Sequence, residues 1–221
     1  MPSFLQHLAW WPMRFVLRVF CSLRIQGIEN IESLKTNLII ASNHTSELDP
    51  LLIVACLPFF SCHLPLYFVS REKSFYKNSR RSFMYGGRFF KMMGAYPAYV
   101  GLNNYELALR HHLEAIDRGG NVCIFPVGKK HLSSEVIKAK GGVSYMAIKT
   151  GLPIIPVMIQ GIEKLTFASF ISGKRKLTIT FGEPLYVKDI FKNLDKKTTD
   201  LDKKDYENAA AVLMRKVAQL S

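Results

Sequence analysis

The sequence lacks the cysteine pairs that would indicate disulfide bridges or a zinc centre. Its 221 residues contain only four cysteines, none in a Cys-x-x-Cys pair, and all lie in apolar stretches: Cys21, Cys56, Cys62 and Cys123. Buried, reduced thiols are typical of proteins from a reducing compartment. No group of histidines, cysteines and carboxylates has the spacing of a metal site, so we expect no bound metal.

Internal repeats, low-complexity tracts and nucleic-acid-binding motifs are also missing. The chain is therefore neither a solenoid nor a disordered tail. Its length and its hydrophobic content of 48% are sufficient for one sizeable core, in one domain with or without an appendage. Charge alone would allow a nucleic-acid partner, but without a recognised motif we expect none.

The net charge of +13 is concentrated in acid-poor segments. Residues 1–26 contain three arginines and no acid, residues 71–91 contain seven basic residues and one glutamate, and residues 164–176 contain four basic residues and no acid. Such segments favour an anionic membrane surface or an acidic cosubstrate such as coenzyme A. Plain solubility is an equally good explanation of the charge by itself.

Residues 1–26 are predicted to form an amphipathic helix that associates with a membrane. Apolar side chains recur at helical spacing from Phe4 to Phe20, a narrow polar strip that includes Arg14 and Arg18 lies opposite, and Pro12 is expected to kink or divide the helix. Tryptophans beside arginines are typical of an interfacial anchor. The alternative is a helix that packs on the protein's own core.

A second stretch, residues 50–70, contains no charged side chain and is long enough to span a bilayer. Three prolines interrupt it, and a proline inside a helix costs about 3 kcal/mol. We therefore interpret these residues as a buried helix, a loop and a strand rather than as a transmembrane helix.

Strand and helix patterns alternate along the chain, which predicts an α/β fold: a single layered domain, residues 27–221, with a mostly parallel or mixed sheet flanked by helices. The expected strands are Asn37–Ser42, Leu66–Ser70, Ala95–Val100, Asn121–Phe125, Ile154–Ile159 and Leu177–Phe181. The expected helices are Pro50–Leu57, Ser79–Met92, Asn103–Arg118, Gly142–Thr150 and Asp205–Leu220. Functional residues of such sheets lie in loops at the strand ends, where His44, Gly101 and Gly128 are found.

The first of these loops reads Asn43-His44-Thr45-Ser46-Glu47-Leu48-Asp49-Pro50. On a straight helix His44 and Asp49 would lie about 140° apart, so they can touch only across a turn. Asp49 as a helix cap, with Pro50 at the first helical position, would supply that turn. In contact, Asp49 would orient His44 as a general base for a substrate hydroxyl. From the spacing alone, a polar loop residue near a capping aspartate is the simpler explanation.

Three further blocks follow in order, and they change that judgement. They read Gly94-Ala95-Tyr96-Pro97-Ala98-Tyr99-Val100, Ile124-Phe125-Pro126-Val127-Gly128-Lys129-Lys130 and Leu152-Pro153-Ile154-Ile155-Pro156-Val157-Met158-Ile159. With the first block they resemble the glycerolipid acyltransferase family typified by 1-acylglycerol-3-phosphate acyltransferases, over residues 37–181. The resemblance implies an O-acyltransferase that moves a fatty acyl group from an acyl thioester to the hydroxyl of a lysophospholipid.

The resemblance also implies roles for residues and partners. His44 would be the general base and Asp49 the residue that orients it. Acyl-CoA or acyl-carrier protein would be the donor cosubstrate, with no other cofactor. The protein would be peripheral or monotopic, on the cytoplasmic face of a membrane with an anionic surface.

Two blocks depart from the family pattern. Val100 stands where an arginine usually contacts the acceptor phosphate, and Val127 replaces an acidic residue. The acceptor is then either still anionic or a different lysolipid or alcohol. An anionic acceptor would be bound by Gly128, Lys129, Lys130, Arg71 and Lys73, although lysine lacks the planar grip of arginine. A non-catalytic lipid-binding relative is the third alternative, against which the retention of His44 and Asp49 argues.

Overall fold

The computed structural model describes residues 2–46, 48–71, 91–99, 104–127, 138–162, 175–191 and 200–221. In this part of the chain a seven-stranded sheet has the order β1-β7-β6-β2-β5-β3-β4. All neighbouring strands are parallel except β6 and β7. The strands are β1 (Cys21–Gln26), β2 (Ile39–Ser42), β3 (Leu66–Arg71), β4 (Ala95–Ala98), β5 (Asn121–Ile124), β6 (Ile154–Gln160) and β7 (Arg175–Phe181).

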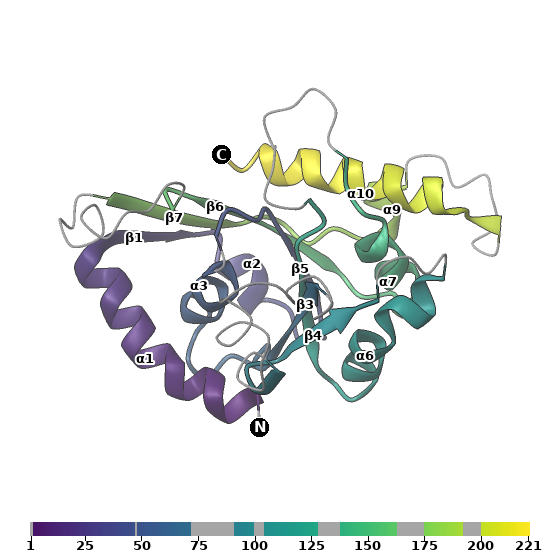
Figure 1. The fold of residues 1–221 in the computed structure, drawn as a ribbon. Helices are drawn as coiled ribbons and strands as arrows, with labels where there is room; N and C mark the ends of the chain where they lie inside the picture. The colour runs from purple at the N-terminus through teal and green to yellow at the C-terminus, as the bar shows by residue number, and fades with distance from the viewer. Residues whose placement is uncertain are drawn as a thin grey trace, which may run out of the picture.

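Helices cover both faces of this sheet (Figure 1). One layer contains α1 (Pro2–Phe20), α2 (Glu29–Glu32) and α3 (Asp49–Cys56), and the other contains α6 (Tyr105–Asp117), α7 (Gly142–Thr150), α9 (Val187–Ile190) and α10 (Lys203–Ala218). In β2, Ile40 packs toward the first layer, whereas Ile39 and Ala41 pack toward the second. Because both faces are buried, the central strands are continuous apolar runs. The predicted α/β fold with a mixed sheet flanked by helices is confirmed.

The predicted elements within the described residues are found with small shifts at their ends. Gly151, at a φ of 69°, ends α7 as expected. Residues 50–70 form most of α3, a turn and most of β3, as we interpreted them. The predicted helix Ser79–Met92 lies almost entirely outside the described residues.

The N-terminal helix is shorter than predicted. It ends at Phe20, and Cys21–Gln26 form the edge strand β1, which pairs in parallel with β7. Apolar Cys21, Leu23 and Ile25 alternate with polar residues, which is the pattern of a strand with one covered face. The helical periodicity just before this strand hid that change of period.

Polar groups on α1 fix the helix against its neighbours. Gln6 is fully buried, and its amide hydrogen-bonds both the N–H and the carbonyl of Leu66 and the carbonyl of Met93. Trp10 Nε1 donates to the carbonyl of Leu57 at the C-terminal end of α3. The helix is thus docked on the core, and it continues through Pro12.

The opposite side of α1 faces outward and is apolar. Five large side chains on it are between 52% and 71% exposed, and we call them the α1 stripe: Phe4, Leu8, Trp11, Phe15 and Val19. The docked helix therefore makes the core contact that the sequence left open as an alternative, and it also exposes an apolar face. In the described part of the chain, no helix has the length and apolar character required to cross a bilayer.

Gly27, between β1 and α2, packs closely against the main chain at the end of β7. Its φ is +67°, and an added Cβ would collide with the carbonyl oxygen of Phe181. We expect Gly27→Ala to lower the free energy of unfolding by about 3 kcal/mol, because a main-chain clash adds to the strain of a left-handed alanine. Gly119→Ala, at φ +82° with nothing within 4 Å of the new Cβ, should lose only about 1 kcal/mol. Urea unfolding measures both, and equal losses would contradict this account.

Candidate functional site

The loop after β2 brings His44 and Asp49 into contact. Their Nδ1 and Oδ2 atoms are 2.8 Å apart, and because an ionised carboxylate only accepts, Nδ1 carries the proton. The required turn is closed by the Asp49 N–H, which donates to the Ser46 carbonyl at 3.2 Å. The prediction that Asp49 caps α3 is wrong. Asp49 is the first residue of the helix and Pro50 the second, and Leu48 occupies the capping position.

The Asp49 carboxylate is fully buried and is satisfied by the loop itself. Oδ2 accepts from the N–H groups of Thr45 at 2.7 Å and Ser46 at 2.9 Å, and Oδ1 accepts from the Thr45 hydroxyl at 3.2 Å. The side chain points back to the N–H groups that precede the helix, so it does not bond the free N–H groups of the first turn of α3. A buried carboxylate needs such donors, and here they also hold it rigidly beside the imidazole.

The imidazole of His44 lies between the buried carboxylate of Asp49 and the solvent-accessible surface of the protein. Its side chain is 22% exposed, whereas that of Asp49 is 0% exposed. The ring lies 4.6 Å from the ring of Phe125, at a tilt of 30°. Phe125 follows β5, the parallel neighbour of β2, so the strand ends meet as the fold predicted. With Nδ1 bonded to Asp49, Nε2 is the atom that can accept a proton.

Asn43 anchors the residue before the imidazole, a role the sequence reasoning missed. It is 1% exposed, its Nδ2 donates to the Ile159 carbonyl and its Oδ1 accepts the Ile159 N–H, each at 2.8 Å. The amide thereby extends the β2–β6 ladder by one side chain. The available signal was an amide at the end of a buried strand, where an unpaired polar group would be costly.

Cys123 lies in β5 close enough to Asp49 to sense its charge. Burial, and then the charge of Asp49, raise the pKa of this thiol well above its usual value. Cys123 is therefore a neutral thiol rather than a nucleophile. Among the residues that the structure describes, no group of three or more His, Cys, Asp or Glu side chains could hold a metal ion.

The predicted binding residues are only partly placed. Arg71 ends β3 at the same edge of the sheet as His44, and its side chain is not described. Four other predicted residues lie outside the described residues: Lys73, Gly128, Lys129 and Lys130. Val127 is 6% exposed within an apolar cluster, so a carboxylate at this position would lose its water.

His112 corrects an expectation about α6. Two adjacent histidines beside Arg110 on an amphipathic helix are typical of a solvated face, but His112 is fully buried, and its Nε2 lies 3.3 Å from the Phe68 carbonyl. Burial lowers the pKa of His112 to about 4, so the ring is neutral at physiological pH. Leu109 and Ile116, three residues before and four after it, were the signal for this buried face.

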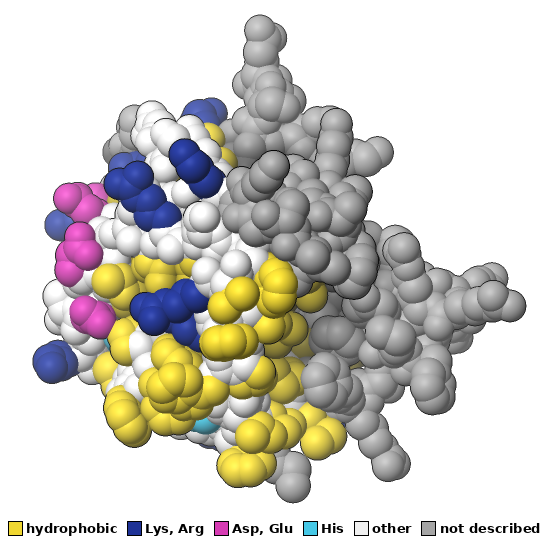
Figure 2. Space-filling view, turned by 90° about the vertical axis from the view of Figure 1, so that its left-hand side faces the viewer, with side chains coloured by type: hydrophobic (Ala, Val, Ile, Leu, Met, Phe, Trp, Pro, Cys, Tyr) yellow, Lys and Arg dark blue, Asp and Glu magenta, His cyan; other side chains and the backbone are white. Residues whose placement is uncertain are grey.

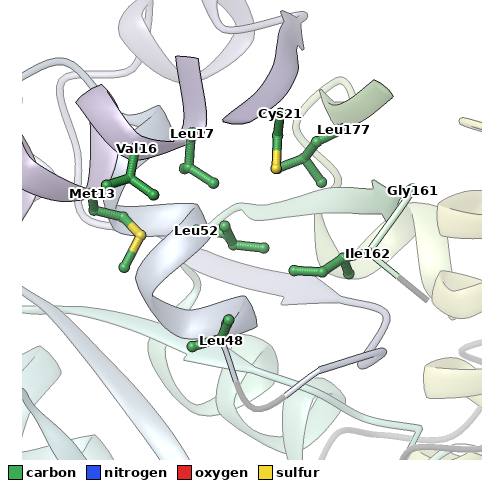
Figure 3. A pocket seen from close by; sticks show the side chains of 9 residues that line it. All are labelled: Met13, Val16, Leu17, Cys21, Leu48, Leu52, Gly161, Ile162 and Leu177. Carbon is green, nitrogen blue, oxygen red and sulfur yellow. The ribbon is translucent and has the colours of Figure 1, made fainter. Parts of the chain in front are cut away.

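An apolar pocket of about 130 Å³ opens beside the loop that joins His44 to Asp49 (Figure 3). None of the described residues that line it is charged, and they come from α1, from α3 and the loop before it, from β1 and β7, and from the end of β6: Met13, Val16, Leu17, Cys21, Leu48, Leu52, Gly161, Ile162 and Leu177. Leu48 belongs both to the pocket and to the loop that joins His44 to Asp49.

Comparison with known sequences gives consistent similarities. A sequence model described as Acyltransferase matches residues 22–160. The chain is 25% identical over 170 residues to the chloroplastic 1-acyl-sn-glycerol-3-phosphate acyltransferase BAT2 of Brassica napus, covering 76% of this chain and 46% of that protein. It is 26% identical over 147 residues to the chloroplastic 1-acyl-sn-glycerol-3-phosphate acyltransferase LPAT1 of Arabidopsis thaliana, covering 66% of this chain and 38% of that protein. The chain thus spans less than half the length of these curated relatives.

A solved structure has the same fold. The 1-acyl-sn-glycerophosphate acyltransferase PlsC from Thermotoga maritima superposes with a TM-score of 0.57 and 21% identity, covering 94% of this chain and 75% of that one. At this identity the similarity establishes the architecture alone.

Asn43 should be important for stability because both of its amide atoms are paired in the interior. We expect Asn43→Ala to lower the free energy of unfolding by about 3 kcal/mol, since it leaves a buried N–H and a buried carbonyl of Ile159 unpaired. Ser42→Ala is the neighbouring control, because the Ser42 hydroxyl makes one long bond, 3.3 Å, to Asn43, and should lose about 1 kcal/mol. Denaturant unfolding followed by circular dichroism measures both. A loss in Asn43→Ala no larger than in Ser42→Ala would refute the anchoring role.

Proposed function

Because the chain belongs to the Acyltransferase family, we propose that it transfers a fatty acyl group from an acyl thioester to the hydroxyl of a lysophospholipid such as 1-acylglycerol-3-phosphate. The observation that carries this proposal is the 2.8 Å contact between a partly exposed His44 and a fully buried Asp49. The similar proteins of Brassica napus and Arabidopsis thaliana are named 1-acyl-sn-glycerol-3-phosphate acyltransferases, which supports this proposal.

The reaction needs two proton transfers, one from the acceptor hydroxyl to His44 and one from His44 to the departing thiolate. Nε2 of His44 takes the proton of the acceptor hydroxyl as its oxygen attacks the thioester carbonyl carbon. The tetrahedral intermediate then collapses, the carbon–sulfur bond breaks, and the departing thiolate takes the proton from the imidazolium. Asp49 stabilises that imidazolium and keeps Nε2 directed at the substrate. No acyl group is attached to the protein at any step.

The apolar pocket is the proposed site for the acyl chain. Its nine lining residues present carbon and sulfur surface from which a hydrocarbon chain would exclude water (Figure 3). Because Leu48 lies one residue before Asp49, a chain in this pocket would be held close to the catalytic loop. The thioester carrier, which remains outside, is either coenzyme A or acyl-carrier protein.

The substrates are lipids, so we propose that the protein works at a membrane surface. The face of the molecule that carries α1 shows apolar side chains gathered around basic ones (Figure 2). The α1 stripe lies exposed there, and residues 2–26 contain Arg14, Arg18 and Arg24 with no acid. Apolar burial together with attraction to anionic head groups is the way a surface helix binds a bilayer. The protein is then peripheral or monotopic, on the cytoplasmic face.

The acceptor head group has two candidates. An anionic phosphate would be bound by the cationic residues near the site, for which we propose Lys129, Lys130, Arg71 and Lys73, with the backbone of Gly128. A different lysolipid or alcohol is favoured by Val127, a buried apolar residue that stands where the family pattern has an acidic one. Initial rates with lysophosphatidate and with neutral lysolipids distinguish these acceptors.

Replacement of the proposed base should abolish turnover. We expect His44→Ala to lower kcat/KM for acyl transfer by about 10²- to 10⁴-fold, because the acceptor hydroxyl loses its general base. Vesicle binding should be unchanged. His111→Ala is the matched control, because His111 is also a partly exposed histidine but lies on α6, and it should keep wild-type rates. Release of free thiol from acyl-CoA in the presence of lysophosphatidate measures the rate. Undiminished turnover in His44→Ala would exclude the mechanism.

The pocket assignment predicts a change in chain-length preference. Val16→Trp places a large ring in the pocket and should shift the preferred acyl donor to a shorter chain, with the preference ratio changing by about tenfold. Val19→Trp adds the same ring less than one turn later, on the outward stripe, and should leave the preference unchanged. Competition between short and long acyl donors, with products separated by mass, reads the ratio. A shift of equal size in both variants would contradict the assignment.

A further inference from the structure

Phe60 stands out among the described residues as the most exposed large apolar side chain, at 93%. It lies in the turn that follows α3 and leads to β3. The Ser61 N–H donates to the Pro58 carbonyl at 3.0 Å, and the Leu64 N–H donates to the Ser61 carbonyl at 3.2 Å. The turn is therefore closed by its own hydrogen bonds, and the exposed ring is held on an ordered support rather than on a loose loop.

The ring is joined to α1 through its neighbour. Phe59 contacts Phe60 at 5.0 Å between ring centroids, Trp10 at 5.4 Å and Trp11 at 6.0 Å. Trp11 is part of the α1 stripe and is 65% exposed. Two segments almost fifty residues apart in the sequence thus form one continuous aromatic surface, with Phe60 at its margin.

We propose that Phe60 inserts into the lipid surface beside the α1 stripe, so that the protein contacts the bilayer through two elements. This inference rests on the proposed function at a membrane. Residues 50–70 contain no charged side chain, so no ion has to lose its water when the turn enters the lipid. The charges nearest in sequence to the aromatic surface are Arg14 and Arg18, which match anionic head groups rather than a basic partner.

A second point of contact has a geometric consequence. A single amphipathic helix lying in the interface can roll about its long axis, whereas a helix and a turn fixed to one another cannot. The turn follows the C-terminal end of α3, and Asp49 is the first residue of that helix. Because α3 is short and hydrogen-bonded to α1 through Trp10, insertion of Phe60 fixes how the loop of His44 is presented to the membrane.

The test is binding of the full chain to vesicles of phosphatidylcholine and phosphatidylglycerol in equal parts, measured by flotation. Phe60→Ser should lower the partition coefficient by about tenfold, the effect of withdrawing one aromatic side chain from lipid. Leu107→Ser is the matched control, because Leu107 is 52% exposed on α6 in the opposite helix layer, and it should bind as the wild type does. Melting temperatures establish that both variants are folded.

A label on the native Cys62 reports the turn directly. This thiol is exposed, whereas the other three, Cys21, Cys56 and Cys123, are buried. The emission of an environment-sensitive fluorophore on Cys62 should shift to shorter wavelength on addition of the vesicles, and brominated lipid should quench it. Both the shift and the quenching should be smaller in Phe60→Ser. Wild-type partitioning of Phe60→Ser, or an unquenched label, overturns the proposal. A monomer–dimer equilibrium changed by Phe60→Ser without a change in partitioning also overturns it, and assigns the turn to self-association.

The vesicle-binding experiments on Phe60 and the assay of acyl transfer can succeed or fail independently. Vesicle binding requires no turnover, so Phe60→Ser can lose lipid affinity even if no acyl transfer is detected, and the surface assignment then stands alone. Conversely, turnover that depends on His44 with unaltered partitioning of Phe60→Ser leaves the enzyme in place and removes only the second contact.

Discussion

The buried carboxylate of Asp49 is the constraint on which the site depends. Removed from water, it requires donors, and the loop from His44 to Ser46 supplies two main-chain N–H groups, a hydroxyl and an imidazole. Satisfying the carboxylate and shaping the loop are therefore the same event. The imidazole is left with one nitrogen bonded in the interior and the other available to a substrate, which is the arrangement a general base needs.

The rest of the fold supports that loop from both ends. On one side Asn43 is hydrogen-bonded to Ile159 of β6, and on the other α3 carries Asp49 and is hydrogen-bonded to α1 by Trp10. α1 in turn exposes an apolar stripe and helps to line an apolar pocket that shares Leu48 with the loop. One helix thus connects the proposed lipid surface, the proposed acyl site and the proposed catalytic pair. This linkage is appropriate for the proposed acyl transfer, in which both substrates are partly apolar.

Most of the sheet could be predicted because its central strands are buried on both faces and appear as apolar runs bounded by glycine and proline. β1 was missed because a strand of alternating pattern directly follows a long helical pattern, and local periodicity does not locate that change. His112 was misplaced because two adjacent histidines beside an arginine resemble a solvated face, whereas burial is decided by α6 packing on the sheet. Asp49 was expected to cap α3, but its acceptor capacity is used by the loop behind it.

By itself the sequence determined the alternation of strands and helices, the positions of His44 and Asp49, and the order of blocks that identifies the family. These are local or ordered features, so they can be read along one chain. Only the tertiary structure decided that His44 touches Asp49, that Asn43 pairs with a residue 116 positions away, and that Phe60 joins Trp11 through Phe59. The physical reason is that hydrogen bonds and ring contacts depend on distances in space, which chain closure and packing set and which spacing along the sequence does not.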